Sequence, residues 1–461
     1  MNLIDNNYIE TACNELDYYN GDLISLMDDF TANFSEKGDW LKLCESVNEI
    51  NILTTEKIFF VHNEPIIVFV KAYATEDLHR IYNRVWCMAR PRLLFLETQT
   101  GLYILDLATQ PLKSDNDLID NSLAIVKNIV EIKTTLNNFR RELIESGEIF
   151  DNDSFSNLED RADRALIRDL KTVREKLYNA GLSGQNLKYA HSIIGKSIFI
   201  RYLEDRGILT SQYFYEIAKS EPGWQQILSN QSDALYVEPE MEKLLYPKVL
   251  TSKSFTNKLF KQIAVDFNGD IFPTDDKEEE IVSDNHLKIL SDFLLGNTQN
   301  QLFFWAYRFD IIPIELISNI YEEFYHYNNR ELEAIKVGKK PDNKGTYYTP
   351  APLVEFLLRR TLTEEILNKK PLVMDPACGS GIFLVESFRR IVRYRSFKKK
   401  NKTVGYSELL VILKNQIAGI ELNEEAVKIT AFSLYLAFLN YCYYSNRSIK
   451  SYLHNVNKKG D

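Results

Sequence analysis

The chain is poor in the residues that build metal centres and disulfide frameworks. Its 461 residues include only five cysteines and six histidines, all scattered, and no two cysteines form a C-x-x-C pair. We therefore expect reduced thiols and no metal site. No apolar run approaches the roughly 18 residues that span a membrane, and the first residues lack the basic and apolar regions of a signal peptide. These absences predict a cytoplasmic protein that has no membrane partner.

The chain also has fewer basic than acidic residues, with 55 Lys and Arg against 65 Asp and Glu and a formal net charge of −10. The shortage is uneven along the chain. Residues 330–461 hold 23 basic and 13 acidic side chains, a formal charge of +10, whereas the other 329 residues hold 32 and 52. A positive segment of this kind suits a module that faces nucleic-acid phosphates. For its densest run, residues 398–402, a solvated loop is the alternative that we favour.

Within this basic segment lies the most informative motif of the sequence, a glycine loop at residues 375–383. The loop reads Asp375-Pro376-Ala377-Cys378-Gly379-Ser380-Gly381-Ile382-Phe383. Residues 371–374 predict a buried parallel strand and residues 384–392 a helix, the opening unit of a nucleotide-binding α/β domain. The glycines lack the Cβ atoms that would keep a ligand off the backbone, and the helix start offers unpaired N–H groups.

The glycine loop matches neither G-x-G-x-x-G nor the phosphate loop G-x-x-x-x-G-K-[ST]. This difference favours a nucleoside ligand without a phosphate chain, and points to S-adenosylmethionine. A turn that serves only close packing of a helix on a strand is the alternative for the loop taken alone.

Two further motifs flank the glycine loop. The upstream motif is Gly345-Thr346-Tyr347-Tyr348-Thr349-Pro350, which ends 25 residues before Asp375, and the downstream motif is Gly419-Ile420-Glu421-Leu422-Asn423. In order and spacing the three resemble the motifs of amino-group DNA methyltransferases, specifically the prokaryotic N6-adenine family of restriction–modification and phage-defence systems (the long type II, IIG-like class). The resemblance implies transfer of a methyl group from S-adenosylmethionine to adenine N6 of duplex DNA.

The three motifs together predict a cofactor site. Asp375 would meet the methionine ammonium at the end of the first strand. Glu421, after a second strand at 416–420, would accept the ribose hydroxyls; a solvated acid at a helix start is its alternative. Thr349 and Pro350 would begin a helix that continues over 354–367. The expected cofactor-binding residues are Thr346, Tyr348, Thr349, Pro350, Asp375, Ala377, Gly379, Ser380, Gly381, Phe383, Glu421 and Asn423.

Cys378 lies inside the glycine loop without a nearby His or second Cys to activate it. We therefore interpret it as a small packed side chain rather than a nucleophile.

The base-holding loop of the resembled family, D/N/S-P-P-Y/F/W, is missing. The chain has 13 prolines, no two of them adjacent, and 40 residues follow Glu421. We therefore expect the truncated front part of a longer enzyme, with no catalytic residues of its own and no activity alone. Its expected partners are duplex DNA and a second polypeptide that carries the remaining strands and the target-recognition domain.

Residues 1–125 predict a small α/β domain, with strands at 66–70, 92–96 and 101–107 and a helix around 76–89. The order resembles the N-terminal domain of long restriction–methylation proteins, which often carries a PD-(D/E)xK nuclease whose acids bind a divalent metal. The candidates are Glu64 and the Glu97-Thr98-Gln99 triplet. Since the usual E-x-K is missing, we favour a nuclease-like fold without an active site.

Residues 126–335 predict a helical domain, because apolar residues recur at helical spacing over 166–177. Residues 190–209 and 309–324 resemble the helical region of the same family. A charged cluster in this region consists of Arg201, Glu204, Asp205 and Arg206. We interpret it as an ion-pair network rather than a catalytic cluster, and we interpret His191 as a packed residue of an apolar stripe.

The sequence thus predicts a mixed fold: an α/β N-terminal domain (1–125), a helical middle domain (126–335) and a partial Rossmann-like α/β methyltransferase domain (336–461), with 336–344 as the linker candidate. Two other function classes stay open. One is a methyltransferase that acts on RNA, protein or a small molecule, and the other is a non-catalytic interaction or DNA-binding module left by truncation.

Overall fold

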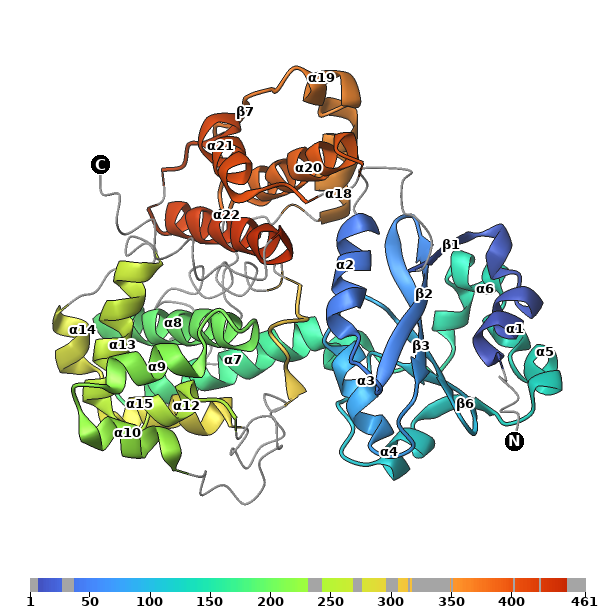
Figure 1. The fold of residues 1–461 in the computed structure, drawn as a ribbon, viewed down its shortest axis with the longest axis horizontal. Helices are drawn as coiled ribbons and strands as arrows, with labels where there is room; N and C mark the ends of the chain where they lie inside the picture. The colour runs from blue at the N-terminus through green and yellow to red at the C-terminus, as the bar shows by residue number, and fades with distance from the viewer. Residues whose placement is uncertain are drawn as a thin grey trace. The chain divides into compact units, whose positions relative to one another are not determined.

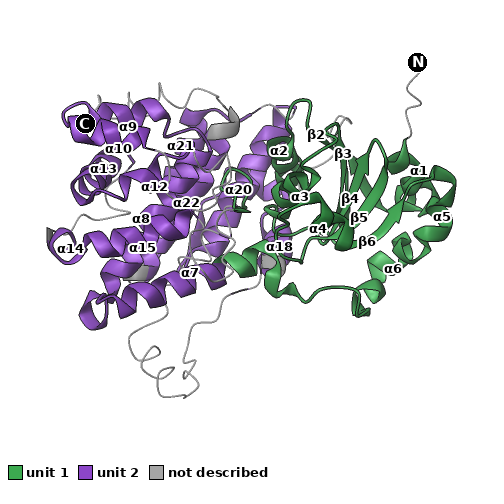
Figure 2. Cartoon of the chain, turned by 90° about the horizontal axis from the view of Figure 1, so that it is seen from below, with its two compact units in different colours: residues 1–166, 306–313 green, residues 167–305, 314–461 purple. Residues whose placement is uncertain are grey.

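The computed structural model describes residues 7–26, 37–230, 243–267, 276–295, 306–313, 316, 349, 351–400, 403–422 and 424–445. The chain divides into two compact units, which Figure 2 colours separately. Unit 1 comprises residues 1–166 and 306–313, and unit 2 comprises residues 167–305 and 314–461. The predicted mixed α/β fold is confirmed.

Unit 1 is built on a six-stranded sheet in sequence order, shown with its labels in Figure 1. Its strands are β1 Asp22–Ser25, β2 Leu53–Val61, β3 Glu64–Ala72, β4 Leu93–Thr98, β5 Gly101–Asp106 and β6 Ser122–Val126. Neighbours are antiparallel except β3 and β4, which run parallel and are joined through α3 Leu78–Trp86. The three predicted strands and the predicted helix between them are confirmed. The sequence analysis did not predict β1, β2 or β6.

Helices cover both faces of this sheet, which explains its apolar runs. On one face Phe69 and Phe95 pack with residues of α1 Tyr8–Glu15, α5 Ile132–Thr135 and α6 Arg141–Ser146. The alternate residues of β3, such as Val68 and Val70, are also fully buried. A strand that is buried on both faces is apolar at every position rather than at every second one.

The boundary predicted at residue 125 falls inside β6, and unit 1 extends to residue 166. Residues 132–149 of this extension include core positions such as Leu136 and Phe139. The three-domain division stays a prediction, and the structure itself separates two units.

The two acidic candidates of a nuclease site lie far apart. In the sheet register Glu97 stands opposite Lys71, at the end of β3 opposite to Glu64. Lys71 follows Glu64 by seven positions along β3, so the two residues lie roughly 23 Å apart at about 3.3 Å of strand length per residue. Glu97 is buried, accepts a hydrogen bond from the backbone N–H of Ile9 at 2.8 Å and lies 3.5 Å from the Lys71 ammonium. These contacts give Glu97 a structural role at the start of α1.

Among the described ranges, no group of three His, Cys, Asp or Glu side chains lies close enough together to hold a metal ion.

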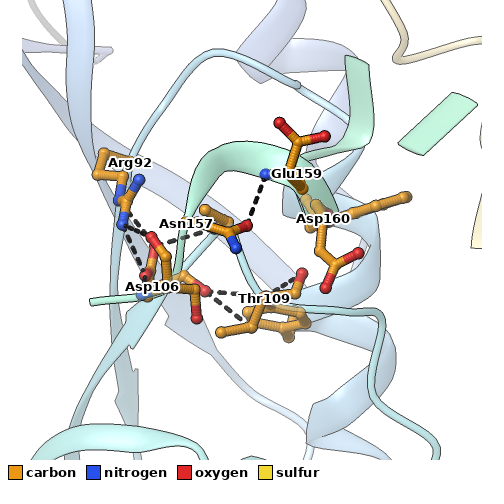
Figure 3. A network of polar contacts seen from close by, with 10 residues as sticks. Arg92, Asp106, Thr109, Asn157, Glu159 and Asp160 are labelled. Atoms are coloured by element: carbon orange, nitrogen blue, oxygen red, sulfur yellow. Dashed lines mark hydrogen bonds and ion pairs between the residues drawn. The ribbon is translucent and has the colours of Figure 1, made fainter. Parts of the chain in front are cut away.

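A buried ion pair ties β5 to the segment that follows the sheet (Figure 3). Arg92 Nε lies 2.9 Å from Asp106 Oδ1, and a guanidinium NH2 of Arg92 donates to the Ser156 carbonyl at 2.6 Å. Asp106 accepts hydrogen bonds from the backbone N–H groups of Ala108 and Ser156, both at 2.9 Å. Burial raises the pKa of Asp106, and the Arg92 guanidinium opposes that rise.

Replacing Arg92 by Met should therefore destabilise unit 1. An uncompensated buried carboxylate costs about 3–5 kcal/mol at neutral pH. Because the folded pKa of Asp106 lies above its unfolded value and would rise further in the variant, the loss should deepen as the pH rises from about 4 to 7. Hydrogen exchange of β4 and β5 peptides at both pH values measures the effect.

The matched control is Arg80→Met, which breaks an exposed pair with Asp77 at 3.6 Å. It should cost at most about 1 kcal/mol. Equal losses in the two variants would contradict the structural role of the Arg92–Asp106 pair.

Unit 2 is mainly helical. The boundary between the units falls inside α7 Ala162–Asn179. The other described helices of unit 2 before residue 305 are α8 Leu187–Asp205, α9 Ser211–Ala218, α10 Pro222–Ser229, α12 Tyr246–Val249, α13 Lys253–Asp266, α14 Asp276–Ile281 and α15 Asp284–Leu294. The later elements are α18 Ala351–Thr361, α19 Glu364–Asn368, β7 Val373–Asp375, α20 Ile382–Lys398, α21 Tyr406–Gln416, β8 Ile417–Gly419 and α22 Glu424–Ser445. No helix of the described parts is both long and apolar enough to cross a membrane.

Three residues of the charged cluster, Arg201, Glu204 and Asp205, form the predicted ion-pair network at the end of α8. The Arg201 side chain is 1% exposed and lies 3.4 Å from Glu204 and 2.9 Å from Asp205. Glu204 also accepts hydrogen bonds from the backbone N–H groups of Leu245 and Tyr246. Burial lowers the pKa of His191 to about 3, which keeps that ring neutral. Through Glu204 the cluster joins α8 to the start of α12.

Helix α8 packs directly on α22. The Phe199 ring lies 5.7 Å from the ring of Phe432 and 6.4 Å from that of Tyr435. Arg206, at the end of α8, donates to the Asn440 side chain at 2.7 Å. The helical region and the segment that carries the glycine loop therefore share one unit, although the sequence had assigned them to separate domains.

Candidate functional site

The site is built where two short parallel strands end. β7 and β8 pair in the register Val373↔Ile417, Met374↔Ala418 and Asp375↔Gly419. Both predicted strands are confirmed, but the expectation that the first is buried is wrong, since Met374 is 53% exposed. α20 packs on both strands and lies close to Gly419, so one face of the pair is covered. Carboxyl ends of parallel strands are where ligands bind in such folds.

The glycine loop is joined to the chain after β8 by backbone hydrogen bonds. Ile420 N–H donates to the Asp375 carbonyl at 2.9 Å, and Cys378 N–H donates to the Ile420 carbonyl at 3.0 Å. The Asp375 carboxylate folds back to accept from Ala377 N–H at 3.1 Å. Two predicted motifs, 45 residues apart at Asp375 and Ile420, therefore meet as one surface.

The two glycines of the loop have different surroundings. Gly379 has φ +54°, and a Cβ at this position would meet no atom of the described residues within 4 Å. Gly381 has φ +85°, but a Cβ there would lie 2.6 Å from the Thr430 side chain. The left-handed backbone therefore explains the glycine at 379, whereas Gly381 is also required by helix packing. Gly419 was also missed as a packing position, because its Cβ would lie 2.5 Å from Leu384.

Glu421 is half-buried and faces the glycine loop. Its Oε2 accepts a hydrogen bond from Gly379 N–H at 2.9 Å, and its Oε1 accepts one from Leu422 N–H at 2.8 Å. Each carboxylate oxygen can accept more than one hydrogen bond, so these contacts are compatible with further hydroxyl donors. The carboxylate therefore lies beside Gly379 at the strand ends, where the predicted ribose role would need it.

The other predicted residues divide into three groups. Thr346, Tyr348, Pro350 and Asn423 lie outside the described residues. Thr349 is half-buried just before α18, and Ser380 and Phe383 are half-buried at the start of α20, whereas Ala377 is exposed. The continuous helix predicted over 354–367 is wrong. Helix α18 ends at Thr361, and a second helix, α19, begins after Thr363. Thr363 has the extended backbone typical of an N-cap residue (φ −67°, ψ 166°).

Thr430 on α22 is a contact that sequence reasoning missed. Its hydroxyl donates to the Gly379 carbonyl at 2.7 Å. The signal that could have revealed it is weak: a threonine nine positions after Glu421, in a helix that also carries the hydroxyl of Ser433.

Cys378 is buried beneath the loop. Burial is the main cause that raises the pKa of its thiol, and the carboxylates of Asp375 and Glu421 raise it further. The group therefore stays protonated at neutral pH, which supports a packing role over a nucleophilic one.

Alkylation by iodoacetamide should show directly that the Cys378 thiol is protonated at neutral pH. Because the thiol pKa lies above its ordinary value, the thiolate becomes abundant only at alkaline pH, so Cys378 should label more slowly than glutathione at pH 7.5 and faster as the pH rises above 9. It should still react before the other four cysteines, since burial raises the pKa of each of those to about 12. Peptide mapping by mass spectrometry measures the order. Rapid, pH-independent labelling near pH 6 would contradict an inert thiol.

Comparisons with known proteins agree with the motifs. Residues 314–458 match the family model described as N-6 DNA Methylase. The chain is 23% identical over 338 residues to the "Putative type II restriction enzyme and methyltransferase RM.MjaORFECS2P" of Methanocaldococcus jannaschii, covering 60% of this chain and 28% of the relative. It is 24% identical over 301 residues to the "Type II restriction enzyme and methyltransferase RM.Eco57I" of Escherichia coli, covering 59% and 26%. A 92-residue stretch is 33% identical to the "Adenine-specific methyltransferase PglX" of Streptomyces coelicolor, covering 19% and 7%.

The chain thus aligns with little more than a quarter of the length of the first two relatives. Among solved structures it is similar to the "cryoEM structure DrdV-DNA complex", with 12% identity, a TM-score of 0.29 and coverage of 94% of this chain and 39% of that one. The three motifs all lie within residues 314–458. The family resemblance inferred from them is confirmed.

Proposed function

We propose that this chain, a relative of the N-6 DNA methylases, provides the S-adenosylmethionine-binding half of an adenine-N6 DNA methyltransferase of a restriction–modification system. The observation that carries the proposal is the junction of the glycine loop with Glu421 at the carboxyl ends of β7 and β8. The match of residues 314–458 to the family model supports it independently.

The residues present fit this cofactor. Among the described residues, no atom comes within 4 Å of the place that a Cβ would take at Gly379, which leaves space there for a ligand. Asp375 and Glu421 carry the two carboxylates of the junction, and these suit an ammonium group and a pair of ribose hydroxyls. Gly381, the residue before α20, has no side chain to cap the first amides of the helix. When bound, the cofactor would supply a sulfonium-activated methyl group, so the protein has mainly to position it.

DNA is the proposed partner of the same segment. Residues 330–461 carry a formal charge of +10 within a chain of net charge −10. Such a surplus attracts phosphates without regard to base sequence. The adenine itself needs a base-holding loop, and no adjacent prolines occur in these 461 residues. We therefore assign that loop, and the choice of the DNA recognition sequence, to a second polypeptide.

Replacing Glu421 by Ala should weaken S-adenosylmethionine binding by roughly 1.5–3 kcal/mol, the contribution of hydrogen bonds to a charged acceptor. Isothermal titration calorimetry of the full chain measures it. Glu408→Ala is the matched control, because it removes a carboxylate that pairs with Lys399 on the same unit without touching the glycine loop. Wild-type affinity in Glu421→Ala would exclude the ribose role.

The 461 residues alone should transfer no methyl group to DNA. The purified chain, incubated with methyl-tritiated S-adenosylmethionine and mixed duplex DNA, should incorporate no label above background, whereas a complete adenine methyltransferase in the same assay should. Formation of N6-methyladenine by the chain itself would show that another loop holds the base.

A further inference from the structure

Thr430 touches the glycine loop at Cys378, Gly379 and Gly381. It lies in the first half of α22 and is 6% exposed. Its hydroxyl donates to the Gly379 carbonyl at 2.7 Å and lies 4.0 Å from the Cys378 sulfur. Its side-chain atoms also lie 2.6–3.0 Å from the position that a Cβ would take at Gly381. The residue therefore controls the conformation of one glycine by a hydrogen bond and that of the other by occupying space.

Gly379 is held from both sides. Its N–H donates to Glu421 and its carbonyl accepts from Thr430, partners that lie 42 and 51 residues away in sequence. With φ at +54°, the residue has a left-handed conformation that a glycine leaves easily when unrestrained. Two fixed hydrogen bonds remove that freedom before any ligand arrives. A site ordered in advance loses less conformational entropy on binding.

We infer that Thr430 is a positioning residue of the cofactor site. Its hydroxyl, opposite the Glu421 carboxylate, holds Gly379 so that the glycine loop stays open toward the methionine end of S-adenosylmethionine. This inference rests on the proposed function and deepens it. Thr430 acts through Gly379 and needs no contact with the cofactor.

The helix that carries Thr430 is itself anchored in the helical region. Phe432 and Tyr435 of α22 pack on Phe199 of α8, and Asn440 bonds to Arg206. Thr430 is therefore mounted on a rigid support, which a positioning residue requires. The helical region contributes to cofactor affinity through this support.

Three variants of the full chain separate the hydroxyl from the packing. Thr430→Val keeps the shape and removes the hydroxyl, and Thr430→Ser keeps the hydroxyl. Ser433→Ala is the matched control, because Ser433 is a buried hydroxyl on the same helix without a hydrogen-bond partner among the described residues. Should Thr430→Val fail to fold, Thr430→Ala replaces it in every measurement.

Calorimetry with S-adenosylmethionine gives the first readout. A net contribution of about 0.5–1.5 kcal/mol for one hydrogen bond predicts roughly 2- to 12-fold weaker binding in Thr430→Val. Thr430→Ser and Ser433→Ala should stay within about twofold of wild type. A purely structural role would instead lower the melting temperature of Thr430→Val and leave its affinity unchanged, which would overturn the inference.

Hydrogen exchange without cofactor gives the second readout. Peptides covering residues 376–384 should exchange faster in Thr430→Val and at the wild-type rate in Thr430→Ser. Unchanged exchange in Thr430→Val would overturn the restraint on Gly379. If wild-type protein failed to bind S-adenosylmethionine, the proposed function would fail and the cofactor role of Thr430 with it, whereas the exchange rates would still decide whether Thr430 fixes the loop.

Discussion

The parallel pairing of β7 with β8 is the constraint on which the candidate site depends. Only three residues of each strand pair, yet this register brings Asp375 beside Gly419 and lets the backbone of Ile420 bond to both Asp375 and Cys378. Without this pairing the glycine loop and Glu421 would belong to separate segments. With it, two carboxylates, an open glycine and the start of α20 meet at one edge.

So small a sheet cannot support itself, and its rigidity comes from the helices around it. α20 packs on both strands and on α22, and α22 packs on α8 through Phe199. Glu204 of α8 in turn accepts hydrogen bonds from the backbone N–H groups of Leu245 and Tyr246 at the start of α12. The site therefore depends on residues about 200 positions earlier in the chain, which explains why the helical region and the glycine loop form one compact unit.

Much of the strand and loop architecture could be predicted, because it is local. Residues 371–392 show a strand, a turn and a helix in their own pattern, and the order of the three motifs indicated the cofactor. What failed depended on distant contacts. The role of Gly381 is set by Thr430, and the exposure of Met374 depends on which elements cover β7. β6 continues the sheet across the expected domain boundary. The prediction of one continuous helix over 354–367 failed for a local reason, since Thr363 begins a new helix, α19, two residues after the end of α18.

The central claim is that the junction of the glycine loop and Glu421 holds S-adenosylmethionine. Ultraviolet crosslinking of methyl-tritiated S-adenosylmethionine to the full chain, followed by peptide mapping, tests it most directly. The account predicts label in peptides that contain residues 371–384 or 417–422, and loss of that label when excess S-adenosylhomocysteine competes. Label confined to other peptides, or label that the competitor does not displace, would contradict it.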